Sequence, residues 1–139
     1  MSVSPDIAAI LLRSRSVAVI GLSNDPFRPS HSVAAYLQRA GYWVTGVHPG
    51  GGRVLGVTRF PDLESAAAEE GPIEIVDIFR RSDAVHELLP VLLKIRPKLV
   101  WMQLGVEDHA TTQALEAAGI PVVQDRCLAV EHQALVARS

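Results

Sequence analysis

The stretch VAVIGLSNDPFRPS, Val17–Ser30, decides the fold of this chain. Its first residues are apolar and mostly β-branched, which is typical of a strand covered on both faces. Gly21 then permits a tight turn, and polar turn residues lead to a helix that Ser30 can cap. This order of strand, glycine turn and helix start predicts an α/β unit whose turn holds an anion. A long capped turn without a ligand is the alternative.

The remaining sequence repeats this alternation of strands and helices. Five strands are predicted, at residues 16–22, 42–47, 73–79, 98–104 and 121–124. Helices are predicted at residues 5–13, 32–40, 63–70, 83–95, 107–118 and 128–137, with Ser4, Ser30, Asp62 and Ser82 as N-caps and a kink or break at Pro90. We therefore expect one Rossmann-like α/β domain over residues 1–139, with three layers and about five parallel strands in the order 3-2-1-4-5. Trp43 and Trp101 are expected in its core.

Composition restricts the class of protein. Hydrophobic residues make up 48% of the 139 residues and charged residues 20%, as in a soluble globular domain. No apolar run approaches the ~18 residues of a membrane span, and the single cysteine with no signal peptide predicts a cytoplasmic protein. A net charge of −2 argues against a general nucleic-acid or membrane surface. Residues 1–61 are nevertheless basic, with six Arg against two acids.

The expected strand order indicates where a ligand would bind. Ligands of open parallel sheets lie beyond the carboxyl ends of the strands, where the strand order reverses. In the predicted order this point lies between the strand that ends at Gly21 and the strand that ends at Gln103. Ser23, Arg28 and the helix start near Ser30 would place hydroxyl, guanidinium and backbone donors there, a combination suited to phosphate.

The loop after the second strand argues against NAD. The chain has no G-x-G-x-x-G fingerprint, and His48-Pro49 stands where an acid would bind the ribose hydroxyl. His48 and Arg53 instead offer positive charge, which favours a ligand phosphorylated on its ribose. A flexible surface loop is the alternative interpretation.

Catalytic groups are scarce. The five histidines and Cys127 lack metal-ligand spacing, so no metal site is predicted. Neither a nucleophile elbow nor a Walker loop is present. Arg126 and a helix start beside Cys127 would favour a thiolate, although a buried, inert thiol is the simpler interpretation.

The ordered motifs resemble those of a known family. They are G-x-S with P-x-R-P-S, then G-Y, V-D-I-F-R, W-M-Q-L-G-V and D-R-C. Together they resemble the small stand-alone CoA-binding-domain proteins of bacteria, which are similar to the CoA-binding domain of succinyl-CoA synthetase α subunits. The resemblance spans residues 6–135, and only the loop HPGGGR differs from the family pattern. It implies coenzyme A as cofactor, with its pyrophosphate at the first loop, its adenosine over the second strand and its pantetheine arm toward residues 103–105. The predicted cofactor-binding residues are Gly21, Leu22, Ser23, Arg28, Ser30, His48, Pro49, Arg53, Phe79, Arg80, Gln103, Leu104 and Gly105.

Three functions follow from these observations. The first is a binding module that carries, senses or delivers CoA or acyl-CoA, and the absence of a complete catalytic set favours it over an enzyme. The second is an NAD(P)-binding oxidoreductase-like protein or a CoA-thioester enzyme that uses Cys127 or a histidine. The third is redox capture, with Cys127 and the CoA thiol in a mixed disulfide. Apolar strand or helix edges would suit a homodimer.

Overall fold

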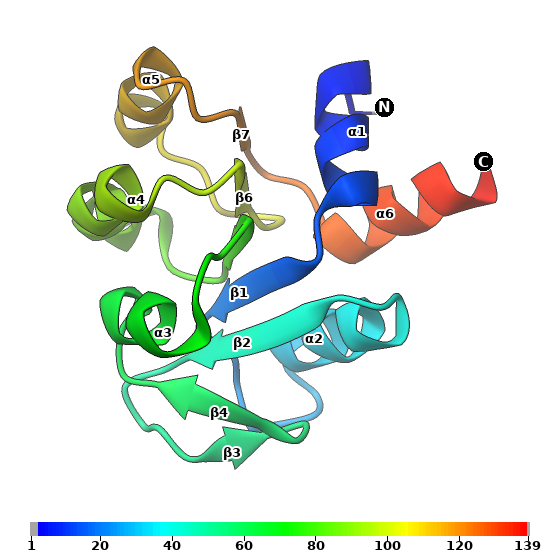
Figure 1. The fold of residues 1–139 in the computed structure, drawn as a ribbon, viewed down its shortest axis with the longest axis vertical. Coiled ribbons are helices and arrows are strands. Elements are labelled where there is room, and N and C mark those ends of the chain that lie inside the picture. Colours follow the sequence, from blue (N-terminus) through cyan, green and yellow to red (C-terminus); the bar gives the residue numbers. More distant parts are fainter. Residues whose placement is uncertain (1–2, 139) are drawn as a thin grey trace.

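A computed structural model describes residues 3–138, so residues 1, 2 and 139 of the predicted domain lie outside it. A mostly parallel seven-stranded sheet has helices on both faces (Figure 1). The strands are β1 Ser16–Ile20, β2 Trp43–Val47, β3 Arg53–Val54, β4 Val57–Phe60, β5 Ile75–Ile78, β6 Leu99–Met102 and β7 Val122–Val123. Their order is β3-β4-β2-β1-β5-β6-β7, and within it β3 pairs antiparallel with β4. The predicted Rossmann-like α/β class is confirmed.

The helices match the predicted segments, with differences at their ends. They are α1 Pro5–Arg13, α2 Pro29–Arg39, α3 Leu63–Glu70, the 3₁₀ helix η1 Ser82–Leu88, α4 Leu89–Ile95, α5 His109–Ala117 and α6 Leu128–Ala137. Ser4 and Asp62 cap α1 and α3 as expected. The predicted helix over residues 83–95 is split into η1 and α4, and Pro90 lies in the first turn of α4, where its missing N–H costs nothing.

Two predicted caps were wrong. The N-cap of α2 is Arg28, because the helix begins at Pro29, whose fixed φ suits a first helical position. The N-cap of η1 is Arg81, and Ser82 is the first residue of that helix. Both serine hydroxyls bond elsewhere in the structure, to groups that sequence spacing does not indicate.

Each face of the sheet has its own apolar core. The core beneath α3, η1, α4 and α5 contains Ala18, Val76 and Met102 from the strands. The core beneath α1, α2 and α6 contains Val17, Ile75 and Trp101. Since side chains alternate along a strand, neighbouring residues of β1 and β5 supply opposite cores, which explains why both strands are mostly apolar.

The expected strand count and order need correction. The stretch after β2 was expected to be a loop because of its glycines, yet it forms the hairpin of β3 and β4. β4 pairs with β2 on its outer side, where the predicted order had placed the strand of residues 73–79. β5 therefore lies between β1 and β6 and not beside β2. The crossover from β4 through α3 to β5 places the reversal of strand order between β1 and β5.

The two tryptophans differ in burial. Trp101 is fully buried in β6, and its indole N–H donates to the Arg126 carbonyl at 2.7 Å. Trp43 was expected in the core, yet its side chain is 65% exposed. It is the first residue of β2, so it lies at the rim of the sheet. Within residues 3–138, the model contains no helix with the length and hydropathy needed to cross a membrane.

Candidate functional site

The site lies where β1 and β5 end side by side. Ile20 pairs with Ile78 in the parallel register, so both loops leave the sheet at the same level. The chain then passes to α2 on one face and to η1 on the other (Figure 1). Divergence of two neighbouring connections opens a crevice at the carboxyl edge of the sheet, the usual place for a ligand in this type of fold.

Gly21 allows the two loops to touch. Its φ is +86°, a conformation that other residues adopt only with strain. A β-carbon at this position would lie 2.3 Å from the Phe79 carbonyl oxygen. The Phe79 N–H donates to the Ile20 carbonyl at 2.9 Å, which fixes the β5 loop against β1. No larger residue fits without moving one of these loops.

A polar cavity of about 290 Å³ begins at Gly21. It brings together six of the predicted residues with Pro29, and the predicted members are Gly21, Ser23, Arg28, Ser30, His48 and Phe79. The Ser30 hydroxyl is buried and accepts a hydrogen bond from the Ser23 N–H at 3.0 Å. Ser30 thus fixes the loop shape, which is why it does not cap α2. Arg28 stands at the positive end of α2, where helix dipole and guanidinium both favour an anion.

The loop itself is held by short-range bonds. The Asp25 N–H donates to the Ser23 hydroxyl and the Phe27 N–H donates to the Asp25 carboxylate, each at 3.0 Å. Residues 24–27 do not line the cavity, and the Phe27 ring is 95% exposed. A loop with internal bonds loses little further entropy when a ligand binds.

Residues of the second loop separate into two groups. His48 lines the polar cavity, and its Nδ1 accepts a hydrogen bond from the Gly50 N–H at 2.9 Å. Pro49 follows it on the exposed surface. Arg53, in β3, does not join them. Its guanidinium donates to the Gly56 carbonyl and the Thr58 hydroxyl at 2.5 and 3.2 Å, and it lines a different hollow near Trp43. The hairpin turns Arg53 away from the predicted ribose region.

Arg59 connects the two loops and was missed by sequence reasoning. Its guanidinium is buried and donates to the carbonyls of Leu22 and Gly51 at 2.8 and 2.6 Å. Leu22, a predicted contact, therefore presents its carbonyl to Arg59 while its side chain lies in the core. The only sequence signal is an arginine between apolar positions of VTRF, and this signal is lost when the segment is interpreted as loop.

A second, mainly apolar groove of about 540 Å³ continues from the polar cavity. The two share Pro29 and Phe79, so they form one continuous crevice. The other groove residues include Arg80, Gln103 and Leu104, all predicted, together with Ser32, Val33, Arg81, Val106 and Cys127. Leu104 is 71% exposed at its edge. The crevice thus passes from a basic, polar end to an apolar end.

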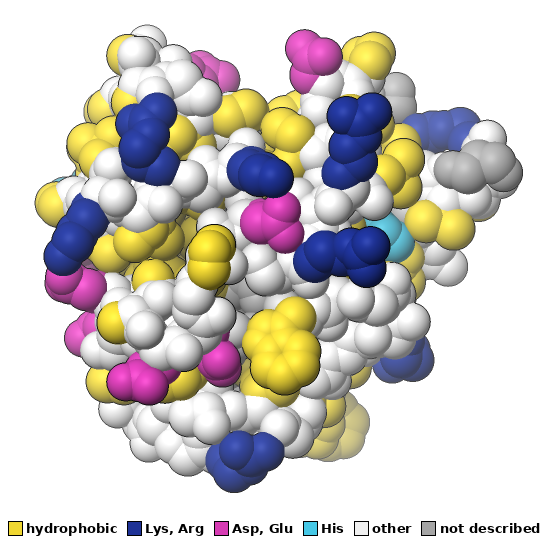
Figure 2. Space-filling model, in the orientation of Figure 1, with side chains coloured by type: hydrophobic (Ala, Val, Ile, Leu, Met, Phe, Trp, Pro, Cys, Tyr) yellow, Lys and Arg dark blue, Asp and Glu magenta, His cyan; other side chains and the backbone are white. Residues whose placement is uncertain are grey.

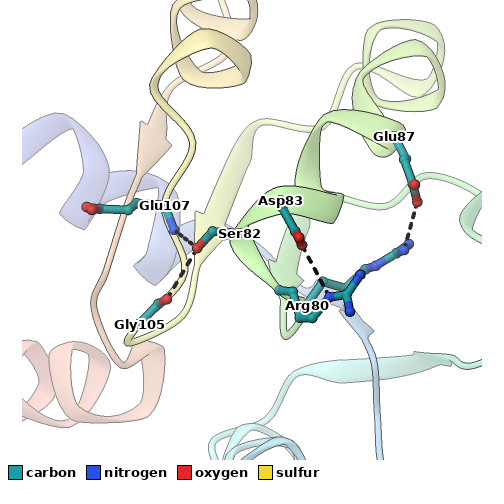
Figure 3. A network of polar contacts seen from close by, with 7 residues as sticks. Arg80, Ser82, Asp83, Glu87, Gly105 and Glu107 are labelled. Carbon is teal, nitrogen blue, oxygen red and sulfur yellow. Dashed lines mark hydrogen bonds and ion pairs between the residues drawn. The ribbon is translucent and has the colours of Figure 1, made fainter.

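A network of polar contacts fixes the far wall of this groove (Figure 3). The Ser82 hydroxyl accepts from the Glu107 N–H at 3.0 Å and contacts the Gly105 carbonyl at 3.4 Å, which ties the β5 loop to the β6 loop. Arg80 forms an ion pair with Glu87 at 2.9 Å. Gly105 supports the wall and does not line the groove, because its N–H donates to the Asp125 carboxylate at 2.7 Å.

Gln103 fixes the end of the groove. Its side chain is 4% exposed, and Oε1 accepts from the Leu128 N–H at 2.9 Å, at the start of α6. Cys127, the N-cap of α6, lines the same groove. Among residues 3–138, no group of three His, Cys, Asp or Glu side chains has the geometry to hold a metal ion.

Asp77 lies on β5 one strand repeat before Phe79. It is fully buried between Val19 and Trp101 of the neighbouring strands, and neither carboxyl oxygen has a hydrogen-bond partner within the described residues. Burial raises the pKa of the Asp77 carboxyl well above its usual value. This shift favours the neutral form of a carboxyl that lies two residues before Phe79, which lines the crevice.

Comparison with known sequences and structures identifies the family. The model of the CoA binding domain matches residues 15–133. This chain belongs to the CoA-binding domain family. An uncharacterized protein of Bacillus subtilis, YneT, is 36% identical over 127 residues, covering 91% of this chain and 92% of YneT. This CoA-binding domain is also 40% identical to the Thermus thermophilus protein ID.343, with a TM-score of 0.89 over 95% of this chain and 99% of that one. A hypothetical protein of Pyrococcus horikoshii OT3 is 31% identical, with a TM-score of 0.87 over 94% of this chain and 90% of that one.

Proposed function

We propose that this protein binds coenzyme A or acyl-CoA in the crevice between β1 and β5, as a stand-alone module that carries, senses or delivers the cofactor. The observation that carries the proposal is the joined pair of cavities, one polar and basic, the other apolar. Coenzyme A has the same two parts, a phosphorylated nucleotide and a long, weakly polar arm. Membership of the CoA-binding domain family supports this choice of ligand.

The pyrophosphate is assigned to the polar cavity. Arg28 and the start of α2 would supply the positive charge, and Ser23 would supply a hydroxyl. His48 and Pro49 would flank the nucleotide. The hairpin position of Arg53 removes it from this assignment. The absence of a side chain at Gly21 lets a phosphate approach the backbone closely.

The pantetheine arm is assigned to the apolar groove. Phe79, Leu104 and Val106 offer apolar contacts along it, and Arg80 stands at its border. The thiol or acyl end would then lie near Gln103 and Cys127. In this arrangement the crevice would position the cofactor and hold its charged end against the donors of the polar cavity.

Calorimetric titration with CoA, dephospho-CoA, NAD and NADP tests this function. CoA should bind more tightly than the other three, and Arg28→Ala should weaken CoA binding by ~1–3 kcal/mol. Lys94→Ala is the control, because it removes one exposed positive charge from α4, which does not line the crevice. If both variants weaken CoA binding equally, the effect of Arg28 comes from net charge alone. Binding of NAD or NADP without binding of CoA would reject the proposal.

A further inference from the structure

A third hollow, of about 590 Å³, lies at the opposite edge of the sheet, where β1 and β2 begin. Its walls come from the ends of α1 and α2 and from α6. The polar side chains in these walls are Arg13, Ser14, Arg15, Tyr42 and His132. All ten described residues that line it are uncharged or basic, and Leu12 and Val136 add apolar surface.

Positive charge accumulates around this hollow. Arg39 lines a smaller hollow that shares Ala40, His132 and Val136 with the first. Over residues 3–138, no ion pair involves Arg13, Arg15 or Arg39. Figure 2 shows Lys and Arg side chains gathered around the end of α1 that leads into β1, with a histidine beside them.

The nearest acid is already engaged outside the hollow. One carboxylate oxygen of Glu74 accepts from the Arg15 backbone N–H at 2.7 Å, and the other pairs with Lys98 at 3.0 Å. Glu74 is therefore satisfied without the Arg15 guanidinium.

The arginines are not required to complete the two helix ends. The Ser14 N–H donates to the Ile10 carbonyl at 2.9 Å, and the Tyr42 hydroxyl donates to the Leu11 carbonyl. At the end of α2, the N–H groups of Gly41 and Tyr42 each donate to a helix carbonyl at 3.0 Å. Since these bonds cap the carbonyls, the guanidinium groups are available for a ligand.

His132 supplies a second, independent observation. Its side chain is 6% exposed, and Nδ1 shares a hydrogen bond of 2.8 Å with the Tyr36 hydroxyl. The ring also meets the edges of Tyr36 and Tyr42 at centroid distances of 5.6 and 5.4 Å. It lines both hollows, and its Nε2 has no hydrogen-bond partner among the described residues. With the tyrosine donating to Nδ1, Nε2 carries the proton and is an available donor on a residue that lines both hollows.

Ser14 also lines the hollow and also has a polar atom without a hydrogen-bond partner in the described part of the chain. Its residue is 7% exposed, and its hydroxyl oxygen has no partner within residues 3–138. Buried polar groups are normally hydrogen-bonded, so the unpartnered Ser14 hydroxyl is an exception, and it lies in the wall of this basic hollow. Guanidinium and imidazole N–H donors match the oxygens of phosphate and carboxylate groups.

We propose that this hollow is a second anion-binding site, which takes a small organic anion bearing a phosphate or carboxylate group, with Arg13, Arg15 and the His132 Nε2 as its donors. The apolar surface of Leu12 and Val136 would contact the body of the ligand. The site shares no lining residue with the crevice, so it stands independently of coenzyme A binding.

The test is a residue-resolved NMR titration of the ¹⁵N-labelled protein at constant ionic strength, with sodium phosphate in one arm and sodium citrate in the other. We expect saturable shifts at the amides of Arg15 and Gly41 and at the His132 ring. The double variant Arg13→Ala/Arg15→Ala should bind at least about tenfold more weakly. Lys94→Ala, which removes one charge on the opposite face, should bind like the wild type.

The two arms also identify the ligand class. Binding of phosphate alone assigns a phosphorylated ligand, and binding of citrate alone assigns a carboxylate. Shifts confined to residues 21–30 would overturn the proposal, since they would place the anion only in the crevice. Equal affinities of the wild type and the double variant would also overturn it. Arg13 and Arg15 are exposed, and a second variant, Arg15→Gln, gives the same comparison if the double variant unfolds.

Discussion

The Phe79 carbonyl oxygen lies 2.3 Å from the point that a β-carbon on Gly21 would occupy. The two residues follow neighbouring strands, β1 and β5, and both line the polar cavity. Their contact sets the width of the crevice at the point assigned to the pyrophosphate. A glycine that appears in the sequence as a turn residue is thus required by a tertiary contact.

Gly21→Ala should destabilise the protein and abolish tight CoA binding. The φ of +86° costs an alanine about 1–2 kcal/mol, and the clash with Phe79 adds to this. Gly56→Ala is the matched control, because Gly56 has a φ of +77° with nothing within 4 Å of its added β-carbon. Urea denaturation and calorimetry measure both effects. Equal loss of stability in the two variants would show that the Phe79 contact has no part in it.

Arg59→Leu should uncouple the two loops. The Leu22 and Gly51 carbonyls lose charge-assisted hydrogen bonds, so we expect a loss of about 2–4 kcal/mol of stability. CoA affinity should also fall, because both loops border the site. Arg53→Leu is the control, since this hairpin arginine is exposed. Unfolding curves and CoA titrations check the prediction, and an unchanged CoA affinity would make Arg59 structural only.

Asp77→Asn should change how stability depends on pH. The pKa of Asp77 is raised on folding, so the native state retains a proton that the unfolded chain releases. This difference in proton binding lowers the stability of the wild type as pH rises above about 4, the pKa of the aspartate in the unfolded chain. The stability of the variant relative to wild type should therefore increase from pH 4 toward neutral pH. Parallel pH profiles from urea unfolding would contradict a neutral, buried carboxyl.

His132→Gln should remove a pH dependence of the opposite sign. Burial lowers the pKa of His132, so the unfolded chain binds a proton that the native state resists. Wild-type stability should be fully present above the unfolded pKa of about 6.5 and should fall as pH drops through the lower folded value. The variant should lack this fall. Unfolding curves at pH 7.5, 6.5 and 5.5, with Arg39→Gln as a control, would detect it, and an unaltered slope would argue against a buried neutral ring.

Sequence reasoning located much of the candidate site but misassigned some of its parts. Arg28 and Ser23 could be placed because they belong to the loop that joins one strand directly to one helix. Ser30 was placed there too, but its hydroxyl binds the Ser23 N–H and does not cap α2. Arg53 was misplaced and Arg59 missed, since both lie in a short hairpin whose pairing depends on β2. Glycines at positions 50–52 and 56 interrupt this hairpin, so its sequence indicates turns rather than strands.

The sequence by itself determined the α/β class, the main strands and helices, and the family, because apolar periodicity and turn residues are local properties of the chain. Tertiary structure alone decided which strands are neighbours, and therefore that Phe79 and not Gln103 faces Gly21 across the point where strand order reverses. It also decided that Trp43 is exposed and that His132 meets Tyr36. The physical reason is that pairing and packing join residues far apart in the chain, which no local pattern encodes.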